Sequence, residues 1–397
     1  MKSVRDVAIA GKRVFIRVDF NVPLDDQGHI TDDTRIKAHF PTIRYVLDQK
    51  GKVILASHLG RPKGKRVEKY SLKPVSLRLS ELLGRPIIFV DDCVGPEAEK
   101  AVASMKEGEI VLLENLRFHA EEEKNDKGFA RELAKLCDVY VDDAFAVAHR
   151  GHASNAGITG YVSECGAGLL LSRELDYLKK ATEDPVRPLV AIIGGAKVSD
   201  KIGVLEKLTE KVDKLIIGGG MAFTFLRALG YEVGKSLCEQ DMLDVAKSIM
   251  AKAGERHVRL YLPVDCVVAQ QPSADAVTKH VTVQEIPKEW MALDIGPAST
   301  TLFGEALADA KTIVWNGPMG MFELAPFSRG TFGLVTFVAS AHALSIVGGG
   351  DTDTAVHQAG EAARISYIST GGGAFLEVLE GKSMPAVEAL ETCGGER

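Results

Sequence analysis

The sequence lacks the features that direct a chain to a membrane or to nucleic acid. None of its apolar runs approaches the ~18 residues that a membrane-spanning helix needs. The N-terminal segment mixes charges with its apolar residues and has no continuous apolar core of the kind found in signal peptides. The net charge is −6, whereas proteins that bind nucleic acid usually carry a strong basic excess. We therefore expect a cytoplasmic protein that binds neither a membrane nor nucleic acid.

Cysteine is too dispersed to predict a disulfide framework or a zinc site. The six cysteines lie far apart, and no two of them form a Cys-x-x-Cys pair. Reduced cysteines, as is usual in the cytosol, are the expectation. His149 and His152 lie close together in the sequence, but no third ligand with suitable spacing accompanies them. Hydrogen bonding or capping is therefore the better interpretation of these two histidines.

Two common nucleotide-binding signatures are also missing. The segment 230–236 resembles a Walker A loop but is one residue too short and follows no apolar strand. Neither Gly218–Gly220 nor Gly348–Gly350 continues to the third glycine of a GxGxxG fingerprint. This absence argues against an NAD-dependent dehydrogenase, the alternative enzyme class for such a chain.

What the sequence does contain is a regular alternation of short apolar runs and helical patterns. A chain of 397 residues is too long for one ordinary core, so two domains are expected. Each apolar run ends in glycine or a polar turn, which is typical of parallel strands covered by helices on both faces. The predicted fold is α/β, with two doubly wound, Rossmann-like parallel sheets joined by a hinge helix. The runs are 14–18, 53–56, 110–113, 139–141, 189–193, 214–217, 259–262, 312–315, 344–347 and 367–369.

The hinge helix is predicted over residues 172–184. Leu171, Leu175 and Leu178 repeat at helical spacing, and two prolines stop the pattern soon afterwards. We interpret it as the connection between domains 1–171 and 172–377, although an ordinary surface helix fits the same pattern.

Glycine-rich segments follow the strands predicted in the second half. Glycine lets backbone N–H groups approach a ligand closely, and a helix N-terminus beyond it attracts anions. Lys197 and Lys201 lie on either side of Ser199, the predicted N-cap of the next helix, where a phosphate chain would offset their unfavourable interaction with the helix dipole. Two solvated surface lysines are the plainer alternative. The segments, which together favour a nucleotide site, are Gly194–Lys197, Gly218–Gly220, Asn316–Pro318, Gly348–Asp351 and Gly371–Gly373.

Asp351 has two equally good interpretations. It follows a triple glycine at the start of a predicted helix, where aspartate is among the best N-cap residues. It is also suited to hold Mg²⁺ against phosphate oxygens, because such ions are usually bound through one or two carboxylates. The sequence leaves both open.

Basic side chains follow the strands predicted in the first half. The carboxyl ends of parallel strands meet at one edge of a sheet, so these side chains are expected to converge. A guanidinium group pairs with carboxylate or phosphate through two hydrogen bonds, which predicts a small substrate with several negative charges. The acidic run Glu121–Glu123 is interpreted as a solvated surface. The arginines are Arg17, Arg61, Arg117 and Arg150, with Arg35 between the first two strands.

Ten motifs occur in the same order in one known family. They are RVDFNVP, SHLGRP, ENLRF, DAFAVAHR, GGAKVSDKI, GGGMAFTFL, LDIGP, WNGPMGMFE, GGGDT and STGGGA. On these motifs the chain resembles the phosphoglycerate kinase family along essentially its full length. The resemblance implies reversible phosphoryl transfer between 1,3-bisphosphoglycerate and ADP, giving 3-phosphoglycerate and ATP. It also implies a monomer whose C-terminal segment 378–397 packs back on a phosphoglycerate-binding domain 1–171, with the nucleotide bound by domain 172–377.

The resemblance further implies roles for individual residues. Those that would bind phosphoglycerate are Asp19, Asn21, Arg35, His58, Arg61, Arg117 and Arg150. Those that would bind the nucleotide are Gly195, Lys197, Lys201, Gly219, Gly220, Asn316, Pro318, Glu323, Gly349, Gly350, Asp351 and Thr352. Arg35 and Lys197 would act in catalysis, and Asp351 would hold Mg²⁺. A non-catalytic nucleotide-binding protein is the remaining alternative, and the retention of these residues argues against it.

The chain departs from the family pattern at a few positions. Ala146 and Val147 replace a usual Gly-Thr, and Ala292 and Ala298 stand where Gly and Lys are common. None of these positions has an implied catalytic role, so they bear on loop details and hinge behaviour.

Overall fold

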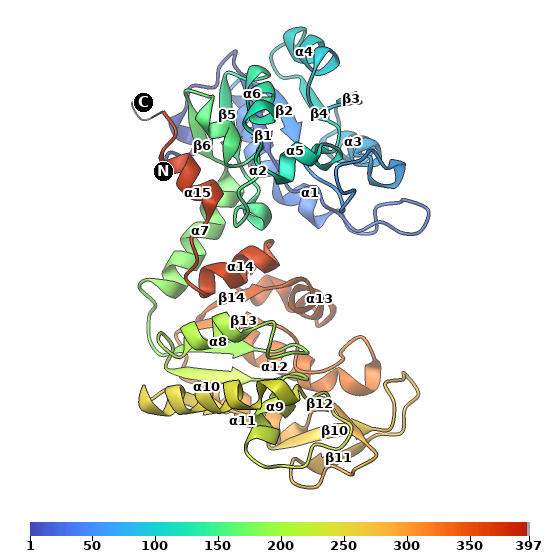
Figure 1. Ribbon diagram of the computed structural model, residues 1–397, viewed down its shortest axis with the longest axis vertical. Coiled ribbons are helices and arrows are strands. Elements are labelled where there is room, and N and C mark those ends of the chain that lie inside the picture. The colour runs from blue at the N-terminus through green and yellow to red at the C-terminus, as the bar shows by residue number, and fades with distance from the viewer. Residues whose placement is uncertain (395–397) are drawn as a thin grey trace. The chain divides into compact units, whose positions relative to one another are not determined.

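The computed structural model describes residues 1–394 and divides into two compact units (Figure 1). One contains Met1–Asp176 and a C-terminal segment that begins at Ser383, and the other contains Tyr177–Lys382. Each unit has a six-stranded parallel sheet flanked by helices, so the predicted α/β fold class is confirmed. Within the described part of the chain, no helix combines the length and apolar character needed to cross a membrane. Residues 395–397 of the predicted returning segment lie outside the described residues.

The sheet of the first unit has the strand order β3-β4-β2-β1-β5-β6. β1 is central and pairs in parallel with β2 and β5, with Phe15 opposite Ile54 and Tyr140. The chain proceeds from β1 to one side and returns to β5 on the other, and ligands bind at such a switch point in doubly wound sheets. The strands are β1 Arg13–Arg17, β2 Lys52–Ala56, β3 Ile88–Val90, β4 Ile110–Leu113, β5 Val139–Asp142 and β6 Cys165–Ala167. The helices are α1 Thr34–Ala38, α2 Phe40–Asp48, α3 Lys73–Leu83, α4 Pro96–Ala103, α5 Ala120–Glu123, α6 Lys127–Lys135 and α15 Pro385–Glu391.

The sheet of the second unit has the strand order β15-β14-β13-β7-β8-β9. β7 pairs in parallel with β13 on one side and with β8 on the other, so the switch point lies between β7 and β13. The strands are β7 Leu189–Ile193, β8 Lys214–Ile217, β9 Arg259–Tyr261, β13 Thr312–Asn316, β14 Leu344–Gly348 and β15 Tyr367–Ser369. The helices are α8 Ile202–Leu208, α9 Ala222–Ala228, α10 Leu243–Glu255, α11 Pro297–Leu307, α12 Arg329–Ser340, α13 Gly350–Gln358 and α14 Gly372–Leu379.

Continuous burial explains why most of these strands are readable from the sequence. All five residues of β7 and all five of β13 are buried, because helices cover both faces of the sheet. In the first unit, Val14, Ile16, Val53 and Leu55 have no exposed surface and belong to one apolar cluster. The apolar runs predicted from the sequence are the strands that cross these cores.

Five strands have no matching prediction. β3 and β6 are three residues long and lie at the two edges of the first sheet. In the second unit, a separate antiparallel sheet has the order β11-β10-β12 (Figure 1). β11 exposes most of its residues and β12 alternates, so neither produces a continuous apolar run, whereas Cys266–Ala269 of β10 is a buried apolar run that the sequence analysis missed. The three strands are β10 Asp265–Ala269, β11 Lys279–Thr282 and β12 Met291–Ile295.

Helix α7 (Leu169–Thr182) carries the chain from the first unit into the second, because the division falls after Asp176. Leu171 and Leu178, two members of the apolar repeat in the predicted hinge helix, are buried. The helix ends two residues before Asp184, as the following Asp-Pro pair predicts.

The C-terminal segment from Ser383 belongs to the first unit. Helix α15 packs against β6, and the N–H of Ala386 donates to the carbonyl oxygen of Ala148 at 3.2 Å (Figure 1). Cys393, just beyond α15, forms a disulfide with Cys165 of β6. The expectation of reduced cysteines is wrong for this pair. The two residues are 228 positions apart in the sequence, so only the packing of α15 reveals their proximity.

Candidate active site

Asp19 organises the predicted anion site at the carboxyl edge of the first sheet. It follows β1 by two residues, is 4% exposed, and accepts a hydrogen bond from Nη1 of Arg35 at 2.5 Å. Its other carboxylate oxygen accepts from the N–H of Asn21 at 3.3 Å and lies 3.7 Å from Nδ1 of His58. The side chain of Arg35 remains 38% exposed, so its guanidinium group is both oriented and accessible.

The loop after β2 is held between two further predicted residues. Oδ1 of Asn21 accepts a hydrogen bond from the N–H of Gly60 at 2.8 Å. Nη1 of Arg117 donates to the carbonyl oxygen of Gly60 at 2.9 Å, while its Nε lies 3.2 Å from Glu123. Gly60 has φ of +63°, a conformation that favours glycine. Asn21 and Arg117 therefore share one loop, although they are distant in the sequence.

His58 and Arg117 are buried near other positive groups, and burial is the main cause of their lowered pKa values. Burial lowers the pKa of His58 well below its ordinary value, and the charges of Arg17, Arg117 and Arg35 lower it further. Burial lowers the pKa of Arg117 to about 10, and the charges of Arg17 and Arg150 act in the same direction against the opposing effect of a carboxylate. Guanidinium groups that disfavour one another's charge are stabilised by an anion placed among them.

His149 and His152 lie in the same positive field. Burial lowers the pKa of His149 to about 4, with a further contribution from Arg150. Burial also lowers the pKa of His152 to about 3, together with the charges of Arg17, Arg117 and Arg150. Nε2 of His149 accepts a hydrogen bond from Nε of Arg150 at 3.1 Å, which agrees with the hydrogen-bonding interpretation of this residue.

A buried polar chain supports the site from behind. Arg17 is fully buried; its Nε donates to Oγ of Ser154 at 2.8 Å, and its Nη2 lies 3.3 Å from Nδ1 of His58. Oγ of Ser154 in turn donates to Glu122 at 2.6 Å. Glu122 is fully buried, and burial raises its pKa even though Arg17 lowers it. The interpretation of Glu121–Glu123 as a solvated surface is therefore wrong for Glu122, which sits beneath the arginines.

Arg61 lies on the same loop as His58 but is exposed, and within residues 1–394 it makes no hydrogen bond or ion pair.

His39, which the sequence analysis missed, accepts a hydrogen bond at Nε2 from the backbone N–H of Asp19 at 2.9 Å. His39 lies in a helical segment outside the ten motifs, so no sequence signal identifies it.

In the second unit, the glycine-rich strand ends pack backbone against backbone. The N–H of Gly195 donates to the carbonyl oxygen of Pro318 at 3.2 Å. The N–H of Gly219 donates to the carbonyl oxygen of Met319, also at 3.2 Å. Gly195 and Gly219 have φ of +118° and +68°. A Cβ on Gly219 would lie 2.5 Å from the carbonyl oxygen of Gly195, so no larger residue fits. The segments after β7, β8 and β13 therefore form one surface of closely spaced backbone groups.

Lys201 and Asn316 meet at the switch point of this sheet. Nζ of Lys201 donates to Oδ1 of Asn316 at 2.5 Å, and Nδ2 of Asn316 donates to the carbonyl oxygen of Gly348 at 2.8 Å. Burial lowers the pKa of Lys201, although the charge of Asp351 opposes that effect. Oγ1 of Thr352 accepts from the N–H of Gly317 at 2.8 Å. The residues predicted after β7, β13 and β14 are thus brought together.

Asp351 is not the N-cap of α13, and its role as an Mg²⁺ ligand stays a prediction. Gly349, with φ of +100°, occupies the N-cap position of α13, and Asp351 lies in the first turn. Its side chain is exposed and, in the described part of the chain, makes no hydrogen bond or ion pair. A Cβ on the neighbouring Gly350 would meet nothing within 4 Å. An unengaged carboxylate beside open backbone fits the hard oxygen ligands that Mg²⁺ prefers.

Other predicted nucleotide residues lie at the surface. Lys197 and Glu323 are exposed, and neither forms an ion pair or hydrogen bond with another residue of the described range. Gly220 is partly exposed. Ser199 is not an N-cap, because its hydroxyl donates to Glu239 at 2.5 Å and α8 begins only at Ile202.

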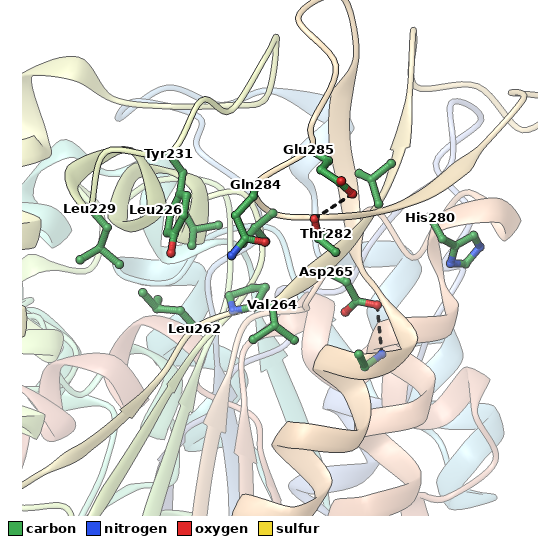
Figure 2. Close-up of a pocket in the computed structure, with 14 residues that line it drawn as sticks. Leu226, Leu229, Tyr231, Leu262, Val264, Asp265, His280, Thr282, Gln284 and Glu285 are labelled. Carbon is green, nitrogen blue, oxygen red and sulfur yellow. Dashed lines mark hydrogen bonds between the residues drawn. The ribbon is translucent and has the colours of Figure 1, made fainter.

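A large cavity lies elsewhere in the second unit, beside the antiparallel sheet (Figure 2). Its volume is about 690 Å³, and its walls include Leu226, Tyr231 and Asp265. Asp265 accepts a hydrogen bond from the N–H of Ala298 at 3.0 Å, which supports the start of α11. None of the predicted nucleotide residues lines this cavity, so it is not the predicted site.

Fold and sequence first define a class: the chain is an α/β phosphotransferase with two doubly wound sheets. The sequence model of one family, described as "Phosphoglycerate kinase", matches residues 4–382. The chain belongs to the phosphoglycerate kinase family.

Relatives and solved structures agree with this assignment. The chain is 60% identical over 387 residues to phosphoglycerate kinase from Geobacter metallireducens, covering 98% of this chain and 97% of the relative. It is 57% identical over 391 residues to that of Desulfotalea psychrophila, covering 98% and 100%. The solved structure of phosphoglycerate kinase from Coxiella burnetii has a TM-score of 0.89 at 44% identity, and that from Pyrococcus horikoshii has 0.86 at 33%, each with 98% of both chains covered.

Proposed function

We propose that the protein catalyses reversible, Mg²⁺-dependent phosphoryl transfer between 1,3-bisphosphoglycerate and ADP, giving 3-phosphoglycerate and ATP in glycolysis and gluconeogenesis. The observation that carries the proposal is the positive field around Asp19, Arg35 and Arg117 in a member of this family. A substrate with a phosphate at one end and an acyl phosphate or carboxylate at the other supplies the matching negative charge.

The first unit is proposed to bind phosphoglycerate. Asp19 orients Arg35, and Asn21 and Arg117 fix the loop that carries His58 and Arg61. His58 is buried with a lowered pKa, so it is neutral at physiological pH and serves as a hydrogen-bonding group. Arg150 completes the set of residues assigned to the substrate anion.

The second unit is proposed to bind ATP or ADP. The backbone around Gly195, Gly219 and Pro318 supplies close, rigid contacts, and Lys201 supplies a positive charge already held by Asn316. Gly220, Glu323, Gly349, Gly350 and Thr352 complete the proposed nucleotide contacts. Asp351 would hold Mg²⁺, which on binding supplies charge neutralisation at the phosphate oxygens.

The chemistry requires no general base. The acceptor in the ATP-consuming direction is a carboxylate, which is already ionised at neutral pH. Catalysis then depends on alignment and on positive groups around the transferring phosphoryl group. We assign that role to Arg35 from the first unit and Lys197 from the second; the exposed side chain of Lys197 is free to reach a bound phosphate.

Ligands on separate units must be brought together for transfer, so we propose hinge bending at α7. Closure that expels water from the site also prevents transfer of the phosphoryl group to water. A monomer in the cytoplasm is proposed from the family resemblance.

The test is ADP formation from MgATP with and without 3-phosphoglycerate. Turnover that requires the acid and collapses when Mg²⁺ is removed supports the proposal. A folded protein that binds nucleotide but shows no acid-dependent turnover would be the non-catalytic alternative. Lys197→Ala is expected to lose turnover while retaining substrate binding, and unchanged turnover removes its catalytic role.

A further inference from the structure

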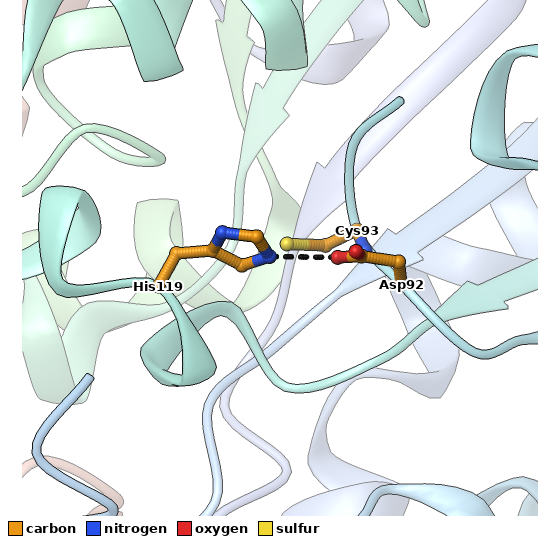
Figure 3. Close-up of side chains that lie close together, drawn as sticks. All are labelled: Asp92, Cys93 and His119. Carbon is orange, nitrogen blue, oxygen red and sulfur yellow. Dashed lines mark hydrogen bonds and ion pairs between the residues drawn. The ribbon is translucent and has the colours of Figure 1, made fainter. Parts of the chain in front are cut away.

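Asp92, Cys93 and His119 bring three different ligand atoms together outside the residues assigned above (Figure 3). A carboxylate oxygen, the Cys93 sulfur and a ring nitrogen of His119 all lie within 4.8 Å of one another. Asp92 and Cys93 belong to the turn between β3 and α4, and His119 follows the short 3-10 helix Leu116–Phe118. In Figure 3 the Cys93 sulfur lies beside the hydrogen bond that joins Asp92 to His119.

The three side chains are already oriented. Oδ1 of Asp92 lies 2.7 Å from Nε2 of His119 and accepts a hydrogen bond from the N–H of Cys93 at 2.7 Å. The His119 ring stacks on Phe129, with ring centroids 5.1 Å apart. Because these contacts hold the side chains of Asp92 and His119 in place, little ordering of these two ligands remains to be done when an ion binds.

Exposure differs across the cluster in a way that admits an ion. Cys93 has no exposed surface, whereas the side chains of Asp92 and His119 are 47% and 29% exposed. An ion can therefore enter past the carboxylate and imidazole and reach the sulfur from the solvent side.

We propose that Asp92, Cys93 and His119 form a zinc site, with a thiolate, an imidazole and a carboxylate as ligands and water in the fourth position. Zn²⁺ is commonly bound in tetrahedral geometry by these three ligand types. The sulfur ligand selects against the hard cation Mg²⁺. On binding, His119 coordinates through Nε2 as the neutral tautomer with its ring proton on Nδ1, and the thiol proton of Cys93 is released to solvent.

The site lies outside the proposed nucleotide and phosphoglycerate residues. It would tie the β3–α4 turn to the segment that carries Arg117, because His119 follows Arg117 by two positions.

The test is a titration of the metal-free full chain with Co²⁺, a spectroscopic probe for Zn²⁺, without nucleotide and with the Cys165–Cys393 disulfide intact. We expect one Co²⁺ per chain, with the near-ultraviolet charge-transfer band of a cobalt–thiolate bond, and displacement by one equivalent of Zn²⁺ but not by excess Mg²⁺. The band should vanish in Cys93→Ala, and binding should weaken at least about tenfold in His119→Gln. Cys137→Ala removes another buried cysteine of the same unit and should leave the charge-transfer band and the Co²⁺ affinity unchanged.

Retention of the band in Cys93→Ala, or its loss in Cys137→Ala, overturns the proposal. If Cys93→Ala does not fold, the Co²⁺ affinities of Asp92→Asn and His119→Gln test the proposal instead. Both variants change partly exposed side chains, so we expect them to fold. Unaltered Co²⁺ affinity in these two variants also overturns it. Phosphotransferase activity is not a readout of this experiment, so its outcome is independent of the proposed function.

Discussion

His39 and Asp143 are 104 positions apart in the sequence, and Nδ1 of the histidine lies 2.7 Å from Oδ2 of the aspartate inside the first unit. Because Nε2 of His39 accepts a hydrogen bond from the N–H of Asp19, Nδ1 carries the proton and donates it to Asp143. Oδ1 of Asp143 accepts from the N–H of Leu170 in the first turn of α7, at 2.9 Å. A continuous line of hydrogen bonds therefore runs from a proposed substrate residue to the helix that leaves this unit.

His39→Leu should destabilise the first unit by about 3 kcal/mol, because it leaves the fully buried carboxylate of Asp143 without its side-chain partner. Differential scanning calorimetry measures this change. The double variant His39→Leu/Asp143→Asn should lose less stability than the sum of the two single variants. Additive losses would show that the pair is not coupled. His29→Leu removes an exposed histidine paired with Asp25 and should change stability little.

Lys201→Met should weaken nucleotide binding selectively. A hydrogen bond to a charged group contributes about 1.5–3 kcal/mol, so we expect KM for MgATP to rise by roughly tenfold to a hundredfold. KM for 3-phosphoglycerate should remain unchanged, because Lys201 contacts Asn316 in the second unit. Steady-state kinetics with each substrate varied in turn is the measurement. Lys207→Met, which removes an exposed pair between α8 and Glu210 just beyond it, is the control. An equal rise in both KM values would contradict the assignment.

Asp294 should make the second unit less stable as pH rises. Burial raises its pKa to about 7, despite hydrogen bonds from the N–H groups of Gly330 and Ile295. Between about pH 4 and pH 7 the folded chain therefore holds a proton that the unfolded chain has released, and stability falls as pH increases through this window. Asp294→Asn should remove that part of the slope.

Tryptophan fluorescence is the suitable readout, since both tryptophans, Trp290 and Trp315, lie in the second unit. Urea unfolding of the native chain and of Asp294→Asn is compared at several pH values. Parallel pH profiles for the two proteins would show that Asp294 does not titrate in this range.

The disulfide should hold the C-terminal segment on the first unit. Reduction, or Cys393→Ser, should lower the stability of this unit by about 2–4 kcal/mol, because the bond closes a long loop of the unfolded chain. Hydrogen exchange should accelerate in α15 and β6. Thiol titration of the unfolded, unreduced protein should find four free cysteines, and six after reduction. Six before reduction would contradict the bond.

The strands that could be predicted share one physical property. β7 and β13 are buried along their whole length, so burial alone produces the apolar runs seen in the sequence. β11 exposes three of its four residues, and its place in an antiparallel sheet depends on pairing with β10. Such pairing is a tertiary interaction and has no local signal.

The candidate site divides in the same way. The rule that parallel strands end at one edge predicts that Asp19 and Arg117 converge, and the structure brings their loops together. Glu122 could not be placed from its neighbours, because its burial depends on Ser154 and Arg17 meeting it from other elements.

The sequence by itself determined the two doubly wound sheets and the family, because apolar periodicity and motif order are local properties of the chain. Only the tertiary structure decided the His39–Asp143 pair, the Cys165–Cys393 disulfide and the cluster of Asp92, Cys93 and His119. The first two join positions more than a hundred residues apart, and the cluster joins the adjacent Asp92 and Cys93 to His119. Hydrogen bonds, disulfides and clusters of this kind depend on distances of a few ångströms that only packing sets.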